Sequence, residues 1–299
     1  AEAVVVAVLK PSRHRVEPKE PLSYLSTSPW QILSFDAENR FKQAIVHETF
    51  EREGVPNIEW STFYAGTDEY GYRNKMEIGF WGDDKGLHLA HYKRGSHKKQ
   101  IVENNALVAS SINQAARDVR DGLQKLGVWA GKLKTLVLRC NQADQAVGAL
   151  FVKQEFDMTG FELPKSLQGL DVYYSNPKSP ASVPTKKVYS FGDITLYDSV
   201  GGVNIKYDVL SFFQVNLPVF EKALSEIKHV LRDYSSIDLF SGVGTIGVIV
   251  GAQKLIEIDK HNCFFATNNS KGSDIEVICA SSEAALEHIS ENQTIIIDP

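Results

Sequence analysis

The chain has 299 residues, 43% of them hydrophobic and 23% charged, with a formal net charge of -5. This composition is typical of a globular protein long enough for two domains, and it excludes a disordered chain or a fibre. No apolar run approaches the roughly 20 residues that cross a bilayer, and the N-terminus lacks a signal pattern. We therefore expect a cytoplasmic protein with no membrane partner.

Three cysteines, Cys140, Cys263 and Cys279, are scattered along the chain without a C-x-x-C pair. This spacing supports neither a disulfide framework nor a cysteine metal site, so we predict three buried thiols and no bound metal. The acidic net charge argues against a generally basic coat for nucleic acid. One basic stretch, "HYKRGSHKK" from His91, is a candidate RNA contact through Lys93 and Arg94, and a solvated loop is the alternative.

The N-terminal sequence predicts one strand and one helix. "AEAVVVAVLKPSRHRV" is β-branched and reads as a strand that runs into a Pro-Ser turn. "DAENRFKQAIVHETFEREG" is typical of a helix that Asp36 caps and Gly54 ends. Its predicted apolar face consists of Phe41, Ala44, Ile45 and Phe50.

Residues 60–205 have the pattern of an α+β domain. "KMEIGFWGDDKGLHLAHY" alternates across a Gly-Asp-Asp-Lys-Gly turn and predicts a hairpin with one buried face. A long amphipathic helix follows, ending at Gly127. Further strands are expected in "TLVLRC", "AVGALFV" and "DVYYS", and a loop in "SNPKSPASVPTKK".

From about Val209 strand and helix patterns alternate strictly. A helix with Asn216 as its cap and Pro218 in its first turn precedes four strands, "SSIDLF", "KLIEID", "IEVICA" and "TIIIDP". Alternation of this kind predicts a doubly wound, mostly parallel α/β sheet, whose ligands bind beyond the carboxyl ends of the strands. Because the chain stops at Pro299, at the end of the fourth strand, we expect this domain to be incomplete.

The first of these strands leads into a glycine loop, in which Gly242, Gly244 and Gly247 have the spacing of a dinucleotide fingerprint. Asp238, four residues before Gly242, would repel a pyrophosphate but suits S-adenosylmethionine, which carries an ammonium and a sulfonium. The alternative is that Asp238 only organises the loop. Asp259, after the second strand, is placed to accept hydrogen bonds from ribose hydroxyls, or else to cap the next helix.

Several motifs together resemble the RNA uracil-5 methyltransferases that act on tRNA and 23S ribosomal RNA. They are "YRNKMEIGF" from Tyr72, "SFFQVN" from Ser211, "DLFSGVGTIG" and the terminal "IIIDP", in the family's order. "VLKPSRHRVEP" resembles the end of the small β-barrel RNA-binding domain called TRAM. The resemblance implies a Rossmann-like class I methyltransferase domain that binds S-adenosylmethionine and yields S-adenosylhomocysteine.

The resemblance also implies roles for individual residues. Gln214 is expected to touch the methyl donor or the target uracil, with Phe212 beside it on the substrate side; a capped helix entry and core is the alternative. Phe240, Gly242, Gly244 and Thr245 are expected to line the donor pocket, Asp259 to hold the ribose, and Asp298 to lie beside donor and uracil. Thr245 stands where an asparagine is frequent, and Ser281 near an expected polar contact with the donor.

The family's chemistry begins with a cysteine thiolate that adds to uracil C6, so that C5 can take the methyl group before a general base removes the C5 proton. The resemblance places this cysteine and a glutamate base beyond Pro299, so no catalytic residue is assigned within the chain. Many relatives also carry an iron-sulfur cluster. Here Glu20, Ser26 and Pro29 stand at thiol positions, so we expect no cluster.

These observations predict four segments: a TRAM remnant (1–16), a linker and helix over the degenerate iron-sulfur region (17–59), a central RNA-binding domain (60–205) and the methyltransferase domain (206–299). The expected function is 5-methyluridine formation in tRNA or ribosomal RNA by a monomer. One alternative is a non-catalytic RNA-binding protein that keeps the fold. Another is a nicotinamide-dependent oxidoreductase, for which no catalytic residue is visible.

Overall fold

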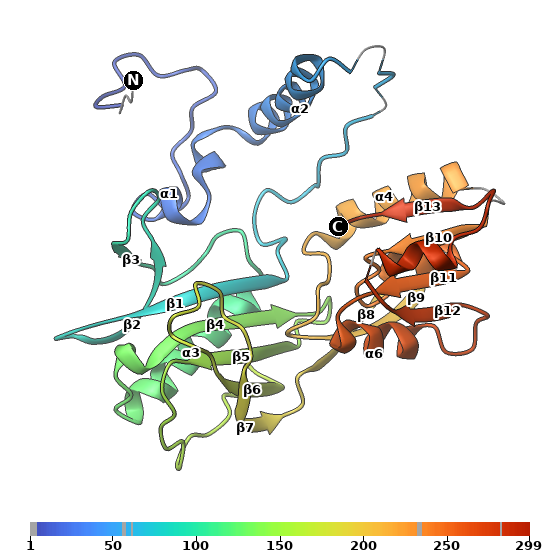
Figure 1. Cartoon of the computed structure of the whole chain (residues 1–299). Coiled ribbons are helices and arrows are strands. Elements are labelled where there is room, and N and C mark those ends of the chain that lie inside the picture. Colours follow the sequence, from blue (N-terminus) through green and yellow to red (C-terminus); the bar gives the residue numbers. More distant parts are fainter. Residues whose placement is uncertain (1–4, 56–57, 61, 232–234, 282) are drawn as a thin grey trace.

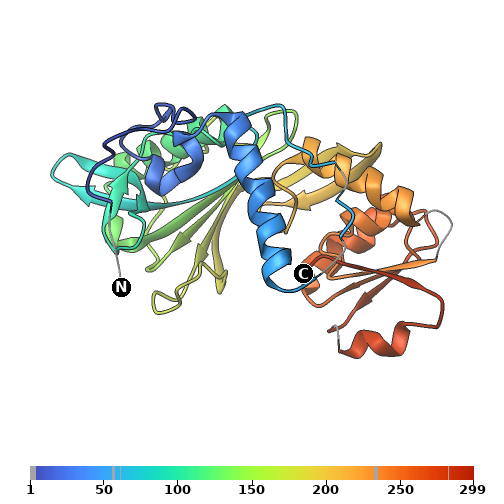
Figure 2. The ribbon, with the colours of Figure 1, turned by 90° about the horizontal axis from the view of Figure 1, so that it is seen from above.

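A computed structural model describes residues 5–55, 58–60, 62–231, 235–281 and 283–299. Two main sheets lie at opposite ends of the molecule, and the C-terminus lies between them in both views (Figures 1 and 2). A seven-stranded, mostly antiparallel sheet has the order β3-β2-β1-β4-β5-β6-β7, and a four-stranded sheet has the order β12-β11-β10-β13. A separate hairpin joins the two parts.

The strands of the large sheet are β1 (Lys75–Asp83), β2 (Gly86–Tyr92), β3 (Lys99–Ile101), β4 (Leu133–Cys140), β5 (Ala146–Val152), β6 (Gly169–Tyr174) and β7 (Lys186–Gly192). The predicted hairpin is therefore β1–β2, and the loop predicted after residue 174 ends where β7 begins. The long amphipathic helix is α3 (Ser110–Lys125), and a short 3-10 turn, η2 (Ala130–Lys132), precedes β4.

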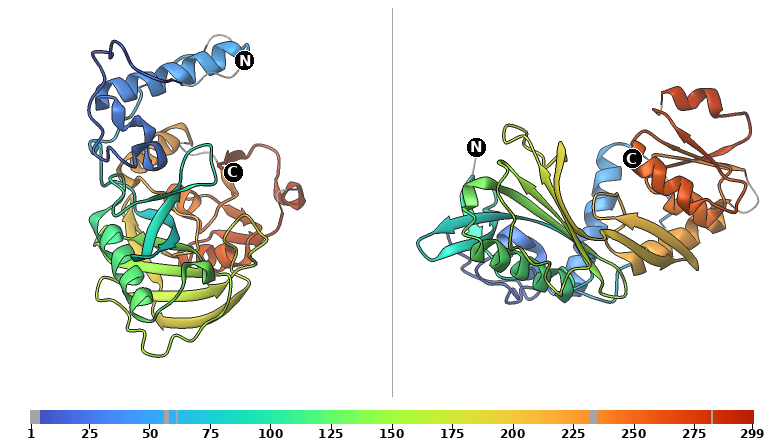
Figure 3. Two further views of the ribbon diagram at one scale, coloured as in Figure 1. Left: turned by 90° about the vertical axis from the view of Figure 1, so that its left-hand side faces the viewer. Right: turned by 90° about the horizontal axis from the view of Figure 1, so that it is seen from below.

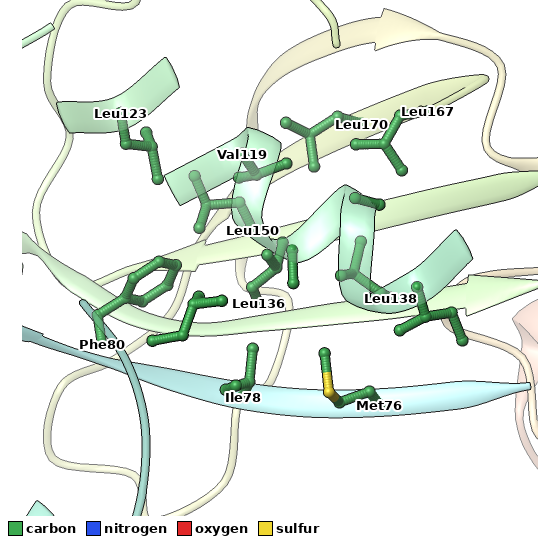
Figure 4. Close-up of a cluster of buried hydrophobic side chains, with 14 of the residues drawn as sticks. Met76, Ile78, Phe80, Val119, Leu123, Leu136, Leu138, Leu150, Leu167 and Leu170 are labelled. Atoms are coloured by element: carbon green, nitrogen blue, oxygen red, sulfur yellow. The ribbon is translucent and has the colours of Figure 1, made fainter. Parts of the chain in front are cut away.

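Helix α3 covers one face of this sheet. Met76, Ile78 and Phe80 point from β1 toward α3 and pack with Val119 and Leu123 (Figure 4). Because side chains alternate along a strand, the intervening residues of β1 face the opposite side. That opposite face is divided: its β5–β6 part packs on the C-terminal half of the chain, as described below.

The C-terminal elements are the hairpin β8 (Thr195–Val200) and β9 (Val203–Asp208), then α4 (Leu217–Leu231), β10 (Ser236–Leu239), α5 (Thr245–Val250), β11 (Lys254–Glu257), α6 (Lys260–Asn269), β12 (Glu276–Cys279), η3 (Ala284–His288) and β13 (Thr294–Ile297). All pairings in the four-stranded sheet are parallel. The α/β class with a doubly wound parallel sheet is thus confirmed.

A shared core connects the two halves. Val147 and Phe151 of the large sheet pack in one cluster with Tyr207 of β9, Phe213 and Ile246 of α5. The hairpin β8–β9 contributes Leu196, Val200, Ile205 and Tyr207 to this cluster, and β9 crosses the expected boundary between residues 205 and 206. The division into four segments accordingly remains a proposal.

The predicted N-terminal strand is wrong where the structure describes it. Residues 5–10 form no strand, and Val5 and Leu9 are 80% and 96% exposed. Only an isolated bridge pairs Arg15 with Leu33. A β-branched run forms a strand only when a neighbouring strand pairs its N–H and C=O groups, and none lies beside this run within the described chain. Residues 1–4 of the expected strand lie outside the described residues.

Two short turns, α1 (Tyr24–Thr27) and η1 (Pro29–Ile32), precede the predicted helix, which is α2 (Phe35–Arg52). Its cap is Ser34, not Asp36, which lies in the first turn. The expected apolar face is not buried: Phe41, Ile45 and Phe50 are 49%, 50% and 41% exposed. The helix projects away from the sheets beyond its first turns (Figure 3, left).

A polar network holds together the segment around α1 and η1, where the resemblance implied a degenerate iron-sulfur region. The Glu20 carboxylate accepts hydrogen bonds from Thr27 Oγ1 at 2.9 Å and from Gln31 Nε2 at 2.8 Å, and Gln31 is buried. The backbone N–H of Glu20 donates back to Gln31 Oε1 at 3.1 Å. Glu20, one of the three residues at thiol positions, therefore serves as the acceptor that ties α1 to η1.

Candidate functional site

The carboxyl ends of four parallel strands meet at one edge of the small sheet. The chain proceeds from β10 outward through β11 to β12, and then returns to the other side of β10 as β13. Strand order therefore reverses between β10 and β13, which is where open α/β sheets bind their ligands. Asp238 of β10 and Asp298, just after β13, lie at this position.

A small pocket brings several of the predicted residues together. Phe212, Gln214, Asp238, Phe240, Thr245 and Asp298 all line it. Gln214 Nε2 lies 3.5 Å from Asp298 Oδ2, at the long limit for a hydrogen bond. The pocket volume is about 30 Å³, which is room for about one water molecule.

Asp238, in β10, holds the start of α5 behind the glycine loop through a hydrogen bond. It is 1% exposed, and its Oδ2 accepts the N–H of Gly247 at 2.8 Å. Burial raises the pKa of this carboxyl to about 7; the nearby charges of Asp298 and Glu257 add to the rise, and the Gly247 hydrogen bond opposes it. The loop-organising role is thus present, and the same carboxyl also lines the pocket.

The glycines are required for different reasons. Gly242 and Gly244 have φ values of +56° and +86°, a region that side-chain-bearing residues rarely adopt. A Cβ at Gly247 would lie 2.1 Å from Leu255 Cδ2 and 2.9 Å from Asp238 Oδ2, so this glycine allows α5 to pack closely on the sheet. Phe240, with φ of +59° and 42% exposure, projects at the rim.

Glu257, the last residue of β11, was not predicted from the sequence. It is buried, its Oε2 accepts the N–H of Gly242 and its Oε1 that of Asp259, both at 2.8 Å. It therefore joins the glycine loop to the turn before α6. The signal in the sequence is a glutamate within the otherwise apolar strand "KLIEID", two residues before Asp259.

Asp259 caps α6, with Oδ1 accepting the N–H of Asn262 at 3.0 Å. Its carboxylate is otherwise exposed at the same edge of the sheet. Ser281 lies after β12, and its Oγ accepts the N–H of Ala284 at 3.3 Å. Neither residue lines the small pocket.

The segment 211–214 beside the pocket is held by residues of the large sheet and by Asn74 before it. Arg139 of β4, 1% exposed, donates to Ser211 O at 3.1 Å and to Phe213 O at 3.2 Å. Asn74 Nδ2 donates to Gln214 O at 2.9 Å. Phe213 is buried against Tyr207, whereas Phe212 is 63% exposed. The segment 211–214 thus combines a buried core residue with outward-facing Phe212 and Gln214.

Lys93 and Arg94 do not join this pocket. They lie in the exposed loop between β2 and β3 of the large sheet. No helix within the described ranges is long and apolar enough to span a membrane. Nor does any group of three or more His, Cys, Asp or Glu side chains suited to a metal ion occur among the residues searched.

The expectation of three buried thiols is wrong for two cysteines. Cys263 of α6 and Cys279 at the end of β12 form a disulfide with a Cα–Cα distance of 5.9 Å. Their separation of 16 residues hides this contact in the sequence, because only the adjacent placement of β11, β12 and α6 brings them together. Cys140 is a buried free thiol, and burial raises its pKa to about 11.

The parallel sheet, the glycine loop and the reversal of strand order between β10 and β13 form a Rossmann-like fold. Two comparisons with known proteins found similar chains. The chain is 24% identical, over all of its length and 71% of the relative's, to an uncharacterised RNA methyltransferase of Fusobacterium nucleatum. It is 26% identical, over all of its length and 73% of the relative's, to one of Caldanaerobacter subterraneus. No model of a known protein family matches it.

Among solved structures, the chain is similar to the Pyrococcus abyssi tRNA (uracil-54, C5)-methyltransferase in complex with S-adenosyl-L-homocysteine. The TM-score is 0.74 at 17% identity, covering 98% of this chain and 72% of the other. The predicted resemblance is therefore confirmed in two respects: the relatives are named RNA methyltransferases, and the fold is that of a tRNA uracil-C5 methyltransferase.

Proposed function

We propose that the protein is an S-adenosylmethionine-dependent RNA methyltransferase that forms 5-methyluridine in tRNA or ribosomal RNA. The observation that carries this proposal is the approach of Gln214 to Asp298 at 3.5 Å. This approach brings Gln214, which is expected to contact the target uracil, next to Asp298, which lies at the sheet edge expected to hold the methyl donor. The names of the relatives and the fold of the archaeal enzyme support the same proposal.

The donor supplies an electrophilic methyl group on a sulfonium. The chain's own residues would bind and orient it. Asp238 and Asp298 place two carboxyls at the pocket, which favours a cationic ligand over a pyrophosphate. Asp259 would accept from the ribose hydroxyls, and Phe240 would cover the donor at the rim. Thr245, Gly242, Gly244 and Ser281 are proposed as further donor contacts.

On the acceptor side, the Gln214 amide both donates and accepts, so it suits the N–H and C=O groups on the edge of a uracil. The exposed ring of Phe212 would stack on the flipped base. Methyl transfer is proposed to follow the covalent route, in which a cysteine adds to C6. Its nucleophile and base are assigned to no residue among 1–299.

Calorimetry of the chain with S-adenosylhomocysteine and with NAD tests the donor. We expect binding of the first alone; binding of NAD alone would contradict the proposal. RNA binding without donor binding would favour the non-catalytic alternative. Mapping 5-methyluridine in total RNA from strains with and without the gene tests the product.

Two variants of Asp259 separate its proposed role from its capping role. Asn is as good an N-cap as Asp, so Asp259→Asn should keep the stability of α6, whereas Asp259→Ala should lose about 1 kcal/mol. Both should weaken S-adenosylhomocysteine binding about tenfold or more, because each removes a charged acceptor of ribose hydrogen bonds. Unchanged affinity in both would remove Asp259 from the site.

A further inference from the structure

The part of the large sheet that α3 does not cover carries two exposed aromatic rings. Trp81 of β1 is 46% exposed and Tyr92 of β2 is 59% exposed. Because side chains alternate along β1, Trp81 lies on the face opposite the buried Met76, Ile78 and Phe80. The register pairs Trp81 with His88 and Gly79 with Ala90, which puts Tyr92 on the same face two residues further along β2.

Positive charge accompanies these rings. Lys99 of β3 pairs with Tyr92 in the register, and its ammonium lies 3.5 Å from the centre of the Tyr92 ring. A Cβ at Gly79 would lie 2.9 Å from Lys99 Nζ, so the ammonium reaches across the face toward β1. Lys93, Arg94 and Lys98 follow in the adjoining loop. None of these four cations forms an ion pair within the described parts of the chain.

The same face leads to the candidate site. Lys75, at the start of β1, lies on it by alternation and pairs with Arg139, which holds the segment before Gln214. Burial and the Arg139 charge lower the pKa of Lys75 to about 8. From Lys75 to Trp81 the strand extends about 20 Å at roughly 3.3 Å per residue, the reach of a few nucleotides.

We propose that this face, defined by Trp81, Tyr92, Lys99 and Lys75, binds a single-stranded segment of RNA next to the target base, with bases stacked on Trp81 and Tyr92 and phosphates near Lys99 and the β2–β3 loop. Stacking on aromatic side chains flanked by cations is how proteins bind unpaired nucleotides without duplex geometry. The inference rests on the proposed RNA methyltransferase function and specifies its substrate as a looped or unpaired RNA.

Fluorescence anisotropy of the whole chain with a short labelled oligouridylate tests this surface. Trp81→Ala and Tyr92→Ala should each weaken binding about tenfold, since stacking contributes about 1–3 kcal/mol per base. Trp81→Phe should restore most of the affinity. In Lys99→Ala, the slope of log binding affinity against log salt concentration should become shallower by about 1, because one phosphate contact is lost.

Tyr197 of β8 supplies the matched control. It is 48% exposed and also has a lysine near its ring, Lys206 at 5.6 Å, but it lies on the separate hairpin. Tyr197→Ala should leave oligouridylate affinity within about twofold. Thermal unfolding of each variant checks that the exposed substitutions leave the fold intact.

Equal losses in Tyr92→Ala and Tyr197→Ala, unchanged affinity in Trp81→Ala and Tyr92→Ala, or stronger binding of the same sequence as a duplex would each overturn the inference. S-adenosylhomocysteine calorimetry on the same preparations keeps the two proposals separate. Donor binding with no effect of Trp81→Ala and Tyr92→Ala overturns only the RNA surface. Stacking-dependent oligouridylate binding without donor binding overturns only the methyltransferase proposal.

Discussion

Arg139 holds the backbone of Phe213 across the boundary between the two sheets. Its guanidinium donates to Phe213 O at 3.2 Å and to Ser211 O at 3.1 Å, and it lies 5.9 Å from the centre of the Phe213 ring. Burial lowers the pKa of Arg139 to about 10, so it stays charged near neutral pH. One buried cation therefore fixes the main chain immediately before Gln214.

Replacing this cation should destabilise the fold. Arg139→Met leaves two buried carbonyls without donors, and we expect a loss of about 2–4 kcal/mol in the free energy of unfolding. Arg139→Lys keeps the charge but not the fork that reaches both carbonyls, so it should lose less. Urea unfolding measures both. A loss below about 0.5 kcal/mol in Arg139→Met would contradict the assigned hydrogen bonds.

Donor affinity should depend on pH through Asp238. Its carboxyl has a raised pKa of about 7, so this carboxyl is partly protonated at neutral pH. The sulfonium and ammonium groups of S-adenosylmethionine favour the carboxylate, and affinity for this donor should therefore rise as pH increases through about 7. Calorimetry at pH values on either side, in buffers of different ionisation enthalpy, should detect proton release below the pKa.

Asp238→Asn is the control for this pH dependence. The amide oxygen can still accept the Gly247 N–H, so the loop should keep its structure while the titrating charge is removed. We expect weaker binding with a flatter pH profile. The same slope in Asp238→Asn as in the unmodified chain would assign the titration to another group.

Particular residues show what the sequence could predict and what it could not. Alternation and glycine spacing located β10, the glycine loop and Asp238, because these patterns are local. The segment "TLVLRC" predicted β4 correctly. The sequence did not reveal the hydrogen bonds of its Arg139, because the two acceptor carbonyls lie 72 and 74 residues away along the chain. The β-branched run at residues 5–9 had strand propensity without a partner strand. Pairing over long separations, as for Cys263 and Cys279, was likewise invisible.

His261 and Asp208 should make stability depend on pH. His261 Nε2 forms a hydrogen bond with Asp208 Oδ1 at 3.0 Å, and this hydrogen bond raises the pKa of His261 against the effect of its partial burial. Burial alone would raise the pKa of Asp208, but the interaction with His261 lowers it. The histidine contribution is complete below its unfolded pKa of about 6.5 and is lost as pH rises through the folded value. The carboxylate contribution is lost as pH falls below about 4.

His261→Gln should remove the part of this dependence above pH 6.5. The side chain is 42% exposed, so solvent screening keeps the effect small. Unfolding free energies of the chain and the variant, measured from about pH 5 to 8, should converge at the alkaline end. Curves that stay parallel over this range would show that His261 does not titrate with the expected partner.

Gly247 packs closely against both Leu255 and Asp238. Gly247→Ala puts a Cβ 2.1 Å from Leu255 Cδ2 and against the carboxyl of Asp238, so the start of α5 must move away from β10 and β11. We expect a loss of about 1–3 kcal/mol in stability together with weaker donor binding. Gly251→Ala is the comparison, because no atom lies within 4 Å of its Cβ and only its φ of +75° opposes the change. That variant should lose about 1 kcal/mol and keep donor affinity, since Gly251 lies at the far end of α5. If urea unfolding and calorimetry gave the two variants equal losses, the contact of Gly247 with Leu255 and Asp238 would have no special role in forming the site.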